Sequence, residues 1–194
     1  MFEKKFDVKL MCQLALLVAL YFLLSVTLVI HTGNFKLTFI SLPVIAAALL
    51  YGPGAGFTVA LLGEFLAQMC GPYGLAPNTV LWLIPPAVNG LLVGTAALVA
   101  WKRKKVLERR PAACYAVCLI CAVLTSGVNT LVLWADSVLY GYYSFAFIFG
   151  SAVLRLGKDL IVAAIVTTIA IPLVHALRRS GLVADAGRLD RQAQ

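Results

Sequence analysis

Four charged side chains interrupt the apolar runs of this sequence, and they are the first candidates for chemistry. Glu64 stands alone in one run, and Arg155, Lys158 and Asp159 fall together in another. A charge within an apolar helix costs about 2.5–3.5 kcal/mol on membrane-insertion scales, so we expect each to find a partner inside the protein. Arg155 and Asp159 are four residues apart, which places them on one helix face where they can pair. The surplus positive charge is suited to an acidic group of a ligand; the alternative is an ion-pair network that only fixes helix packing.

A carboxylate in an apolar helix can also be a general base, which would make the protein a membrane-embedded enzyme using Glu64. No catalytic histidine or nucleophile lies near Glu64 in the sequence, so this alternative is the weaker one. The sequence also has no Walker-type phosphate loop, no Gly-x-Ser-x-Gly elbow and no His-Glu-x-x-His helix. We therefore expect no enzyme activity and no cofactor.

The cysteines and histidines do not predict a metal site. Cys114, Cys118 and Cys121 have a spacing used by iron–sulfur loops, but they lie in an apolar helical run. We expect them to be small packing residues. His31 and His175 fall at opposite membrane faces in the topology described next, so they cannot share a metal ion.

The composition identifies the class of protein. The chain is 62% hydrophobic against about 45–50% for soluble domains, which predicts an integral protein of the cell membrane. Thirteen of its 16 basic residues fall in three clusters: Lys4 to Lys9, Lys102 to Arg110 and Arg178 to Arg191. By the positive-inside rule these segments, and with them both termini, are cytoplasmic. Since the clusters flank apolar runs, the net charge of +8 suits anionic lipid or an acidic partner rather than nucleic acid.

The apolar runs predict an all-α membrane protein with six transmembrane helices. The predicted helices are Leu10 to Ile30, Phe39 to Tyr51, Gly54 to Cys70, Thr79 to Trp101, Ala112 to Trp134 and Ala146 to Leu177. The first run is too long for a cleavable signal peptide. Residues 1–179 are expected to form one transmembrane domain, and residues 180–194 a flexible cytoplasmic tail.

The connections between these helices indicate where a ligand would enter. His31 to Lys36 and Gly71 to Asn78 are predicted to be polar outer loops, and Gly52 to Gly54 an inner turn. Pro85 and Pro86 remove backbone donors from the fourth helix, so we expect a bend beside a lined cavity. Aromatic residues are concentrated on the outer side. An interfacial belt accounts for many of them, whereas the excess suits a mouth that stacks a flat heterocycle.

Small residues in the first helix indicate a possible contact between helices. Ala15 and Ala19 form a small-xxx-small pair, which lets another backbone approach closely. The alternative is that alanine is simply frequent in membrane helices.

Taken in order, these features resemble the substrate-binding S components of energy-coupling-factor (ECF) vitamin transporters, most closely the folate-type group. The resemblance rests on KLTFISLPVIAAALLYGP from Lys36, GFTVALLGEFL from Gly56, the loop before Asn78, Arg155-x-x-Lys158 and Ala15-x-x-x-Ala19. It covers nearly the whole chain. Glu64 stands where members of the family often have aspartate.

The resemblance implies a substrate-binding domain over residues 1–179 that captures a vitamin for ATP-driven uptake, with folate or a related acidic heterocycle favoured. Pantothenate, riboflavin and thiamine are the alternatives. The implied partners are a transmembrane coupling subunit, which would dock at Ala15 and Ala19, and two ATPase subunits. The expected substrate-binding residues are Lys36, Glu64, Asn78, Trp82, Asn89, Asn129, Trp134, Tyr143, Arg155 and Lys158.

Overall fold

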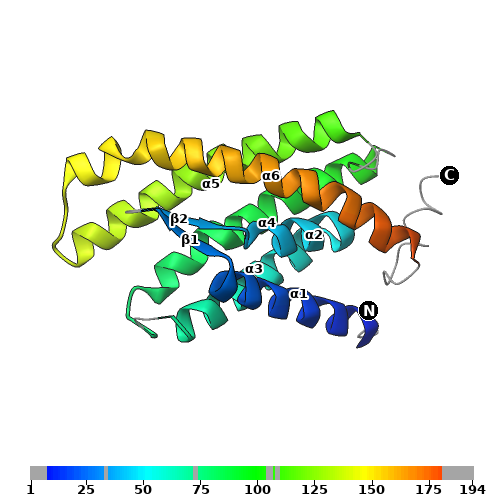
Figure 1. The fold of residues 1–194 in the computed structure, drawn as a ribbon, viewed down its shortest axis with the longest axis horizontal. Coiled ribbons are helices and arrows are strands. Elements are labelled where there is room, and N and C mark those ends of the chain that lie inside the picture. Colours follow the sequence, from blue (N-terminus) through cyan, green and yellow to red (C-terminus); the bar gives the residue numbers. More distant parts are fainter. Residues whose placement is uncertain (1–7, 33–34, 72–73, 104–106, 108–109, 181–194) are drawn as a thin grey trace, which may run out of the picture.

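The computed structural model describes residues 8–32, 35–71, 74–103, 107 and 110–180. Within these ranges the chain folds into a bundle of α-helices with one two-stranded hairpin (Figure 1). The elements are α1 (Val8–Thr27), β1 (Val29–Thr32), β2 (Phe35–Thr38), α2 (Ser41–Tyr51), α3 (Pro53–Met69), α4 (Thr79–Lys102), α5 (Pro111–Leu139), the π-helical turn η2 (Ala146–Gly150) and α6 (Ala152–Arg179).

Four of these helices are long and apolar enough to cross a membrane: α1, α4, α5 and the η2–α6 segment from Ile148 to Arg179. The other two are shorter, at 11 residues for α2 and 17 for α3. The start of α1, the end of α4, the start of α5 and the end of α6 lie at one end of the bundle (Figure 1). We call this the basic end, because the predicted basic clusters flank these elements. The six-span topology with cytoplasmic termini stays a prediction.

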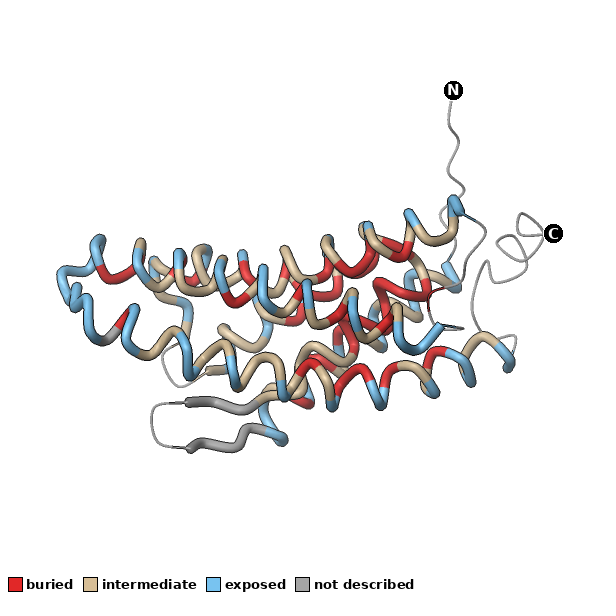
Figure 2. Tube along the Cα trace, turned by 90° about the horizontal axis from the view of Figure 1, so that it is seen from above, coloured by how far each residue is buried: buried red, intermediate tan, exposed pale blue. Residues whose placement is uncertain are grey.

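Helix α2 is the centre of the fold. Every residue from Pro43 to Leu50 is buried, as expected for a helix that is apolar on all sides. It packs against α1, α3, α4 and α6. Figure 2 shows the buried residues concentrated between the helices, with an exposed stretch at residues 138–146, where α5 ends.

A glycine turn joins α2 to α3 within one residue. Gly52 has φ of 90°, a left-handed conformation that favours glycine, and its N–H donates to the carbonyl of Ala48 at 3.0 Å. Pro53 then opens α3, where its missing N–H costs nothing. The predicted turn at Gly52 is confirmed, and it is tighter than expected.

Helices α3 and α4 meet through glycines. A Cβ on Gly90 would lie 2.5 Å from the carbonyl atoms of Gly56, and a Cβ on Gly94 would lie 2.3 Å from the Cα of Pro53. Such distances are incompatible with any side chain, so the two backbones are in direct contact here.

Arg178 connects α6 to α2 and α4 at the basic end. Its guanidinium donates to the carbonyl of Leu49 at 2.9 Å and lies over the ring of Trp101, 5.6 Å from the ring centroid. The first contact satisfies a carbonyl in the last turn of α2, and the second is a cation–π interaction with α4.

Two of the predicted boundaries are wrong. The first helix ends at Thr27 rather than Ile30. The described residues of the predicted outer loop His31 to Lys36 lie in strands of an antiparallel hairpin that pairs Val29 with Thr38 and His31 with Lys36. Val, Ile, Thr and Phe in this segment favour strands over loops, which accounts for the difference. The predicted all-α class is confirmed for the bundle, and the structure adds this one hairpin to it.

The segment between the fifth and sixth predicted helices, Ala135 to Phe145, is helical over its first five residues. Helix α5 continues to Leu139, and burial of Asp136 and Ser137 supports the extra turn. The Asp136 carboxylate accepts a hydrogen bond from the Tyr142 hydroxyl, which closes the turn after the helix. Partial burial and this bond raise the pKa of Tyr142 to about 12.

Candidate functional site

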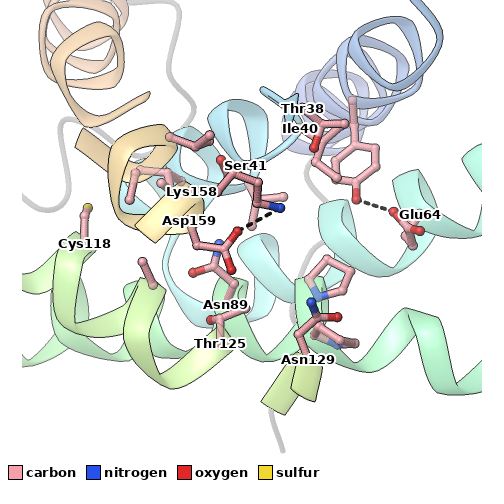
Figure 3. Close-up of a pocket in the computed structure, with 18 of the residues that line it drawn as sticks. Thr38, Ile40, Ser41, Glu64, Asn89, Cys118, Thr125, Asn129, Lys158 and Asp159 are labelled. Atoms are coloured by element: carbon pink, nitrogen blue, oxygen red, sulfur yellow. Dashed lines mark hydrogen bonds and ion pairs between the residues drawn. The ribbon is translucent and has the colours of Figure 1, made fainter. Parts of the chain in front are cut away.

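A cavity of about 260 Å³ lies inside the bundle, and every α-helix contributes to its wall (Figure 3). Its polar lining residues are Tyr21, Thr38, Ser41, Glu64, Asn89, Cys118, Thr125, Asn129, Lys158 and Asp159. The remainder of the wall is apolar, with Trp82 and the two prolines of α4 among its residues. A small polar chamber with apolar walls is the usual form of a small-molecule site.

Glu64 is held at one side of the cavity by two donors. The hydroxyl of Tyr21 donates to one carboxylate oxygen at 2.6 Å, and the Gln68 amide donates to the other at 2.8 Å. Tyr21 is fully buried, and Gly63 provides the space for it, since a Cβ on Gly63 would lie 2.5 Å from the tyrosine ring. The prediction that Glu64 finds a partner inside the protein is confirmed. A carboxylate anchored in this way is positioned for binding rather than poised as a free base.

The second charged group of the cavity is an ion pair on α6. Lys158 Nζ lies 3.1 Å from a carboxylate oxygen of Asp159, and each side chain is 26% exposed. Figure 3 shows this pair across the cavity from Glu64. Among the described lining residues, one cation thus stands against two carboxylates.

The remaining polar lining groups are neutral. Asn89 comes from α4, and Thr125 and Asn129 come from successive turns of α5. The Thr125 hydroxyl is buried without a hydrogen-bond partner among the described residues. A buried unpaired hydroxyl is costly, so its presence on a cavity wall indicates a group that a ligand would satisfy.

The structure brings five of the predicted binding residues together at the cavity: Glu64, Trp82, Asn89, Asn129 and Lys158. They come from α3, α4, α5 and α6, so only the tertiary fold unites them.

The other predicted residues do not line this cavity. Arg155 turns away to donate to the carbonyl of Ile148 in η2. Trp134 and Tyr143 are 44% and 50% exposed. Asn78 precedes α4, where its carbonyl accepts from the N–H of Leu81. Lys36 lies in β2, and its side chain is outside the described part of the chain.

The expected pairing of Arg155 with Asp159 is wrong. Asp159 pairs with its neighbour Lys158 instead. The cause is the π-helical turn before α6, which offers the carbonyl of Ile148 to the Arg155 guanidinium. The Arg155 guanidinium is therefore directed to a backbone carbonyl rather than to the cavity, and its Nε is buried without a hydrogen-bond partner among the described residues.

Sequence reasoning missed Tyr21, Ser41, Thr125 and Cys118 as lining residues. Tyr21 could have been predicted, because a phenol in the middle of an apolar helix needs a hydrogen-bond partner. Thr125 and Ser41 could not, since hydroxyl residues in helices commonly bond to their own backbone. Cys118 was expected to be a packing residue; it is buried, as are Cys114 and Cys121, and it also reaches the cavity wall.

These features define a class of protein: a membrane-embedded helical bundle around a small-molecule cavity, without a nucleophile and base in contact among the described lining residues. Comparison identifies the family. The chain belongs to the S components of ECF-type riboflavin transporters, because the family model described as "ECF-type riboflavin transporter, S component" matches residues 5–179.

Solved structures show the same fold. The chain is similar to "the S component of a bacterial ECF transporter" with a TM-score of 0.65 and 19% identity, covering 89% of this chain and 97% of the other. It is also similar to the "S-component for biotin from an ECF-type ABC transporter", with a TM-score of 0.57 and 17% identity, covering 89% and 94%. No curated protein matches the chain.

The prediction of an ECF S component is confirmed. The chain is an integral, multi-pass membrane protein that serves a vitamin transporter, and its family is one of transporter components rather than enzymes. Such components associate with an ECF module. The family that matches is named for riboflavin, whereas folate was the vitamin favoured from the sequence.

Proposed function

We propose that this S component captures riboflavin, a neutral flat heterocycle with a hydroxylated chain. The observation that carries the proposal is the riboflavin family match over residues 5–179, and the charge balance of the cavity supports it by disfavouring an acidic vitamin. Lys158 is paired with Asp159, Glu64 is held by two donors, and Arg155 is engaged elsewhere. With one cation against two carboxylates on the described wall, a ligand carboxylate would be repelled rather than bound.

The neutral groups of the wall suit the two parts of such a ligand. Trp82 and the prolines of α4 offer apolar surface to a flat ring. Asn89, Thr125 and Asn129 offer amide and hydroxyl groups to ring carbonyls and chain hydroxyls. The volume of about 260 Å³ lies at the small end of ligand sites, which favours one compact vitamin over folate with its added benzoate and glutamate groups.

The proposed direction of capture is from outside the cell. Helix α4 presents Trp82 and Asn89 to the cavity, whereas its last residues lie at the basic end. Because basic segments stay on the cytoplasmic side, a cavity on the first half of α4 is displaced toward the outer face.

The test is the affinity of purified protein for a panel of vitamins. Riboflavin, folate, biotin, pantothenate and thiamine are titrated by calorimetry, and riboflavin also by quenching of its fluorescence. We expect riboflavin to bind at least about tenfold more tightly than the others, a difference of about 1.4 kcal/mol. Tightest binding of folate would restore the acidic-vitamin hypothesis and overturn this one.

We further propose that the protein works with a transmembrane coupling subunit and two ATPase subunits, and that α1 is the docking helix. Ala15 and Ala19 are both exposed on α1, which supports this role. Ala15→Trp or Ala19→Trp should abolish co-purification with the coupling subunit while vitamin affinity stays within about twofold. Loss of vitamin binding with assembly intact would contradict the docking role.

A further inference from the structure

A second cavity of about 540 Å³ opens between α4 and α5 at the basic end of the bundle. It shares no lining residue with the cavity around Glu64 and Lys158. A molecule bound in this second cavity would therefore not overlap with a ligand of the first.

The walls of this second cavity are apolar and built from small residues. Ala96 and Ala100 face it from α4, and Ala113 and Val117 face it from α5. Thr95 also lines it, but its hydroxyl is already bonded to the carbonyl of Leu92 at 2.9 Å. The walls thus offer an apolar slot for a hydrocarbon chain.

Two arginines line the same cavity where α4 ends and α5 begins. Arg103 follows the last residue of α4, and Arg110 precedes the first residue of α5. Both are exposed, and within the described part of the chain neither guanidinium is bonded to another residue. The amino-terminal end of α5 adds partial positive charge at this level. Guanidinium groups bind phosphate oxygens through charge-assisted, often paired hydrogen bonds, so both arginines are candidate phosphate ligands.

The dimensions connect the two features. From Thr95 to Arg103 the slot follows α4 over eight residue steps, which is about 12 Å at ~1.5 Å per residue. In the predicted topology, one end of the slot lies at headgroup depth and the other reaches into the hydrocarbon layer. An amphiphile with an anionic head and an apolar tail matches both ends at once.

We propose that this groove binds one anionic phospholipid, with its phosphate between Arg103 and Arg110 and an acyl chain between α4 and α5. A helix of a partner protein could also fill the apolar slot. Such a helix would pair with the two arginines only if it carried an acidic residue at the mouth of the groove. An anionic phospholipid carries a net negative charge in every copy, whereas the choline of a zwitterionic lipid would be repelled by the two arginines. Basic pockets between transmembrane helices at the cytoplasmic side are known to select such headgroups.

Native mass spectrometry of the full chain in detergent, titrated with phosphatidylglycerol, tests the proposal. We expect one retained phosphatidylglycerol per chain, with phosphatidylcholine of the same acyl chains binding at least about tenfold more weakly. In the R103Q/R110Q variant the preference for phosphatidylglycerol should fall at least about tenfold. The K102Q/R179Q variant removes two charges at the same end without altering the groove lining, and it should keep the preference.

Further arms separate the alternatives. Ala100→Leu should fill the slot and displace both lipids, and inorganic phosphate should not compete, because it lacks the chain. Two outcomes would overturn the proposal in favour of general surface charge. One is competition by inorganic phosphate at the concentration used for phosphatidylglycerol, and the other is an equal loss of the preference for phosphatidylglycerol in both double variants. Unchanged lipid binding in R103Q/R110Q together with lost assembly with the coupling subunit would make the groove a protein contact. Unchanged melting temperature and vitamin affinity show that each variant is folded.

Discussion

Helices α3 and α4 pack along each other, but the residues at their contact differ between its two ends. At Gly56 and Gly90 the backbones touch, and no side chain fits between them. Further along the same pair, Glu64 of α3 and Trp82 of α4 line the cavity instead. The difference follows residue size: glycines let the helices touch where they cross, whereas larger side chains line the cavity beyond the crossing. The crossing thus fixes the two helices at the point beyond which the cavity opens.

The largest change is predicted for a substitution that forces α3 and α4 apart at their crossing. Gly90→Leu would place a side chain where a Cβ already lies 2.5 Å from the carbonyl carbon and oxygen of Gly56. The helices must separate, so we expect a loss of about 3 kcal/mol or more of stability and loss of vitamin binding. The measurement is the thermal unfolding midpoint in detergent, followed by size-exclusion chromatography.

Gly127→Ala is the matched control for that substitution. Gly127 also lies inside a helix, but nothing is within 4 Å of a Cβ added there. Alanine should leave stability unchanged or raise it slightly through helix propensity. Equal destabilisation by both substitutions would show that the crossing has no special role.

The second prediction compares two basic residues of α6, Lys158 and Arg155, by their effect on vitamin affinity. Lys158→Met removes the partner of Asp159 and leaves two carboxylates facing the cavity, so affinity for riboflavin should fall about tenfold, or about 1.4 kcal/mol. Arg155→Gln should change affinity by less than about twofold, because Arg155 bonds to Ile148 instead of lining the cavity. Calorimetric titration of both variants with riboflavin measures the two affinities. A larger effect at Arg155 than at Lys158 would contradict the charge balance proposed for the site.

How much of this site the sequence predicts depends on how rare each residue type is in a membrane helix. Glu64, Lys158 and the two asparagines stood out because charge and amide groups are costly among apolar residues. Thr125 did not, because a threonine in a helix normally satisfies its own hydroxyl, as Thr130 does with the carbonyl of Ser126 at 2.9 Å. Only the neighbours supplied by folding reveal which threonine lacks a partner.

The same limit applies to the fold. Apolar runs located all six helices, since their length and composition are local properties. The π-helical turn before α6 was not predicted, because no residue pattern in Ala146–Gly150 distinguishes it from an ordinary helical turn. Since this turn offers the Ile148 carbonyl to Arg155, the cavity lacks the surplus cation on which the sequence-based preference for an acidic vitamin rested.

The last prediction concerns the Thr125 hydroxyl on the cavity wall. Its removal should leave the stability of the protein unchanged or higher but lower the affinity for the vitamin. Thr125→Val keeps the side-chain shape and removes a buried hydroxyl that has no partner among the described residues. Without ligand, the variant should be as stable as the parent protein or more stable by up to about 1 kcal/mol, since an unpaired buried hydroxyl is itself a cost.

If riboflavin satisfies that hydroxyl, its affinity for Thr125→Val should fall about two- to tenfold, the usual value of one hydrogen bond. Thr130→Val on the same helix is the control: it loses a bond to its own backbone and does not line the cavity, so vitamin affinity should not change. Unfolding midpoints and titrations are measured on both variants. A fall in stability at Thr125 with unchanged affinity would show that its hydroxyl serves the fold rather than the ligand, and the α5 wall would then contribute shape alone to vitamin binding.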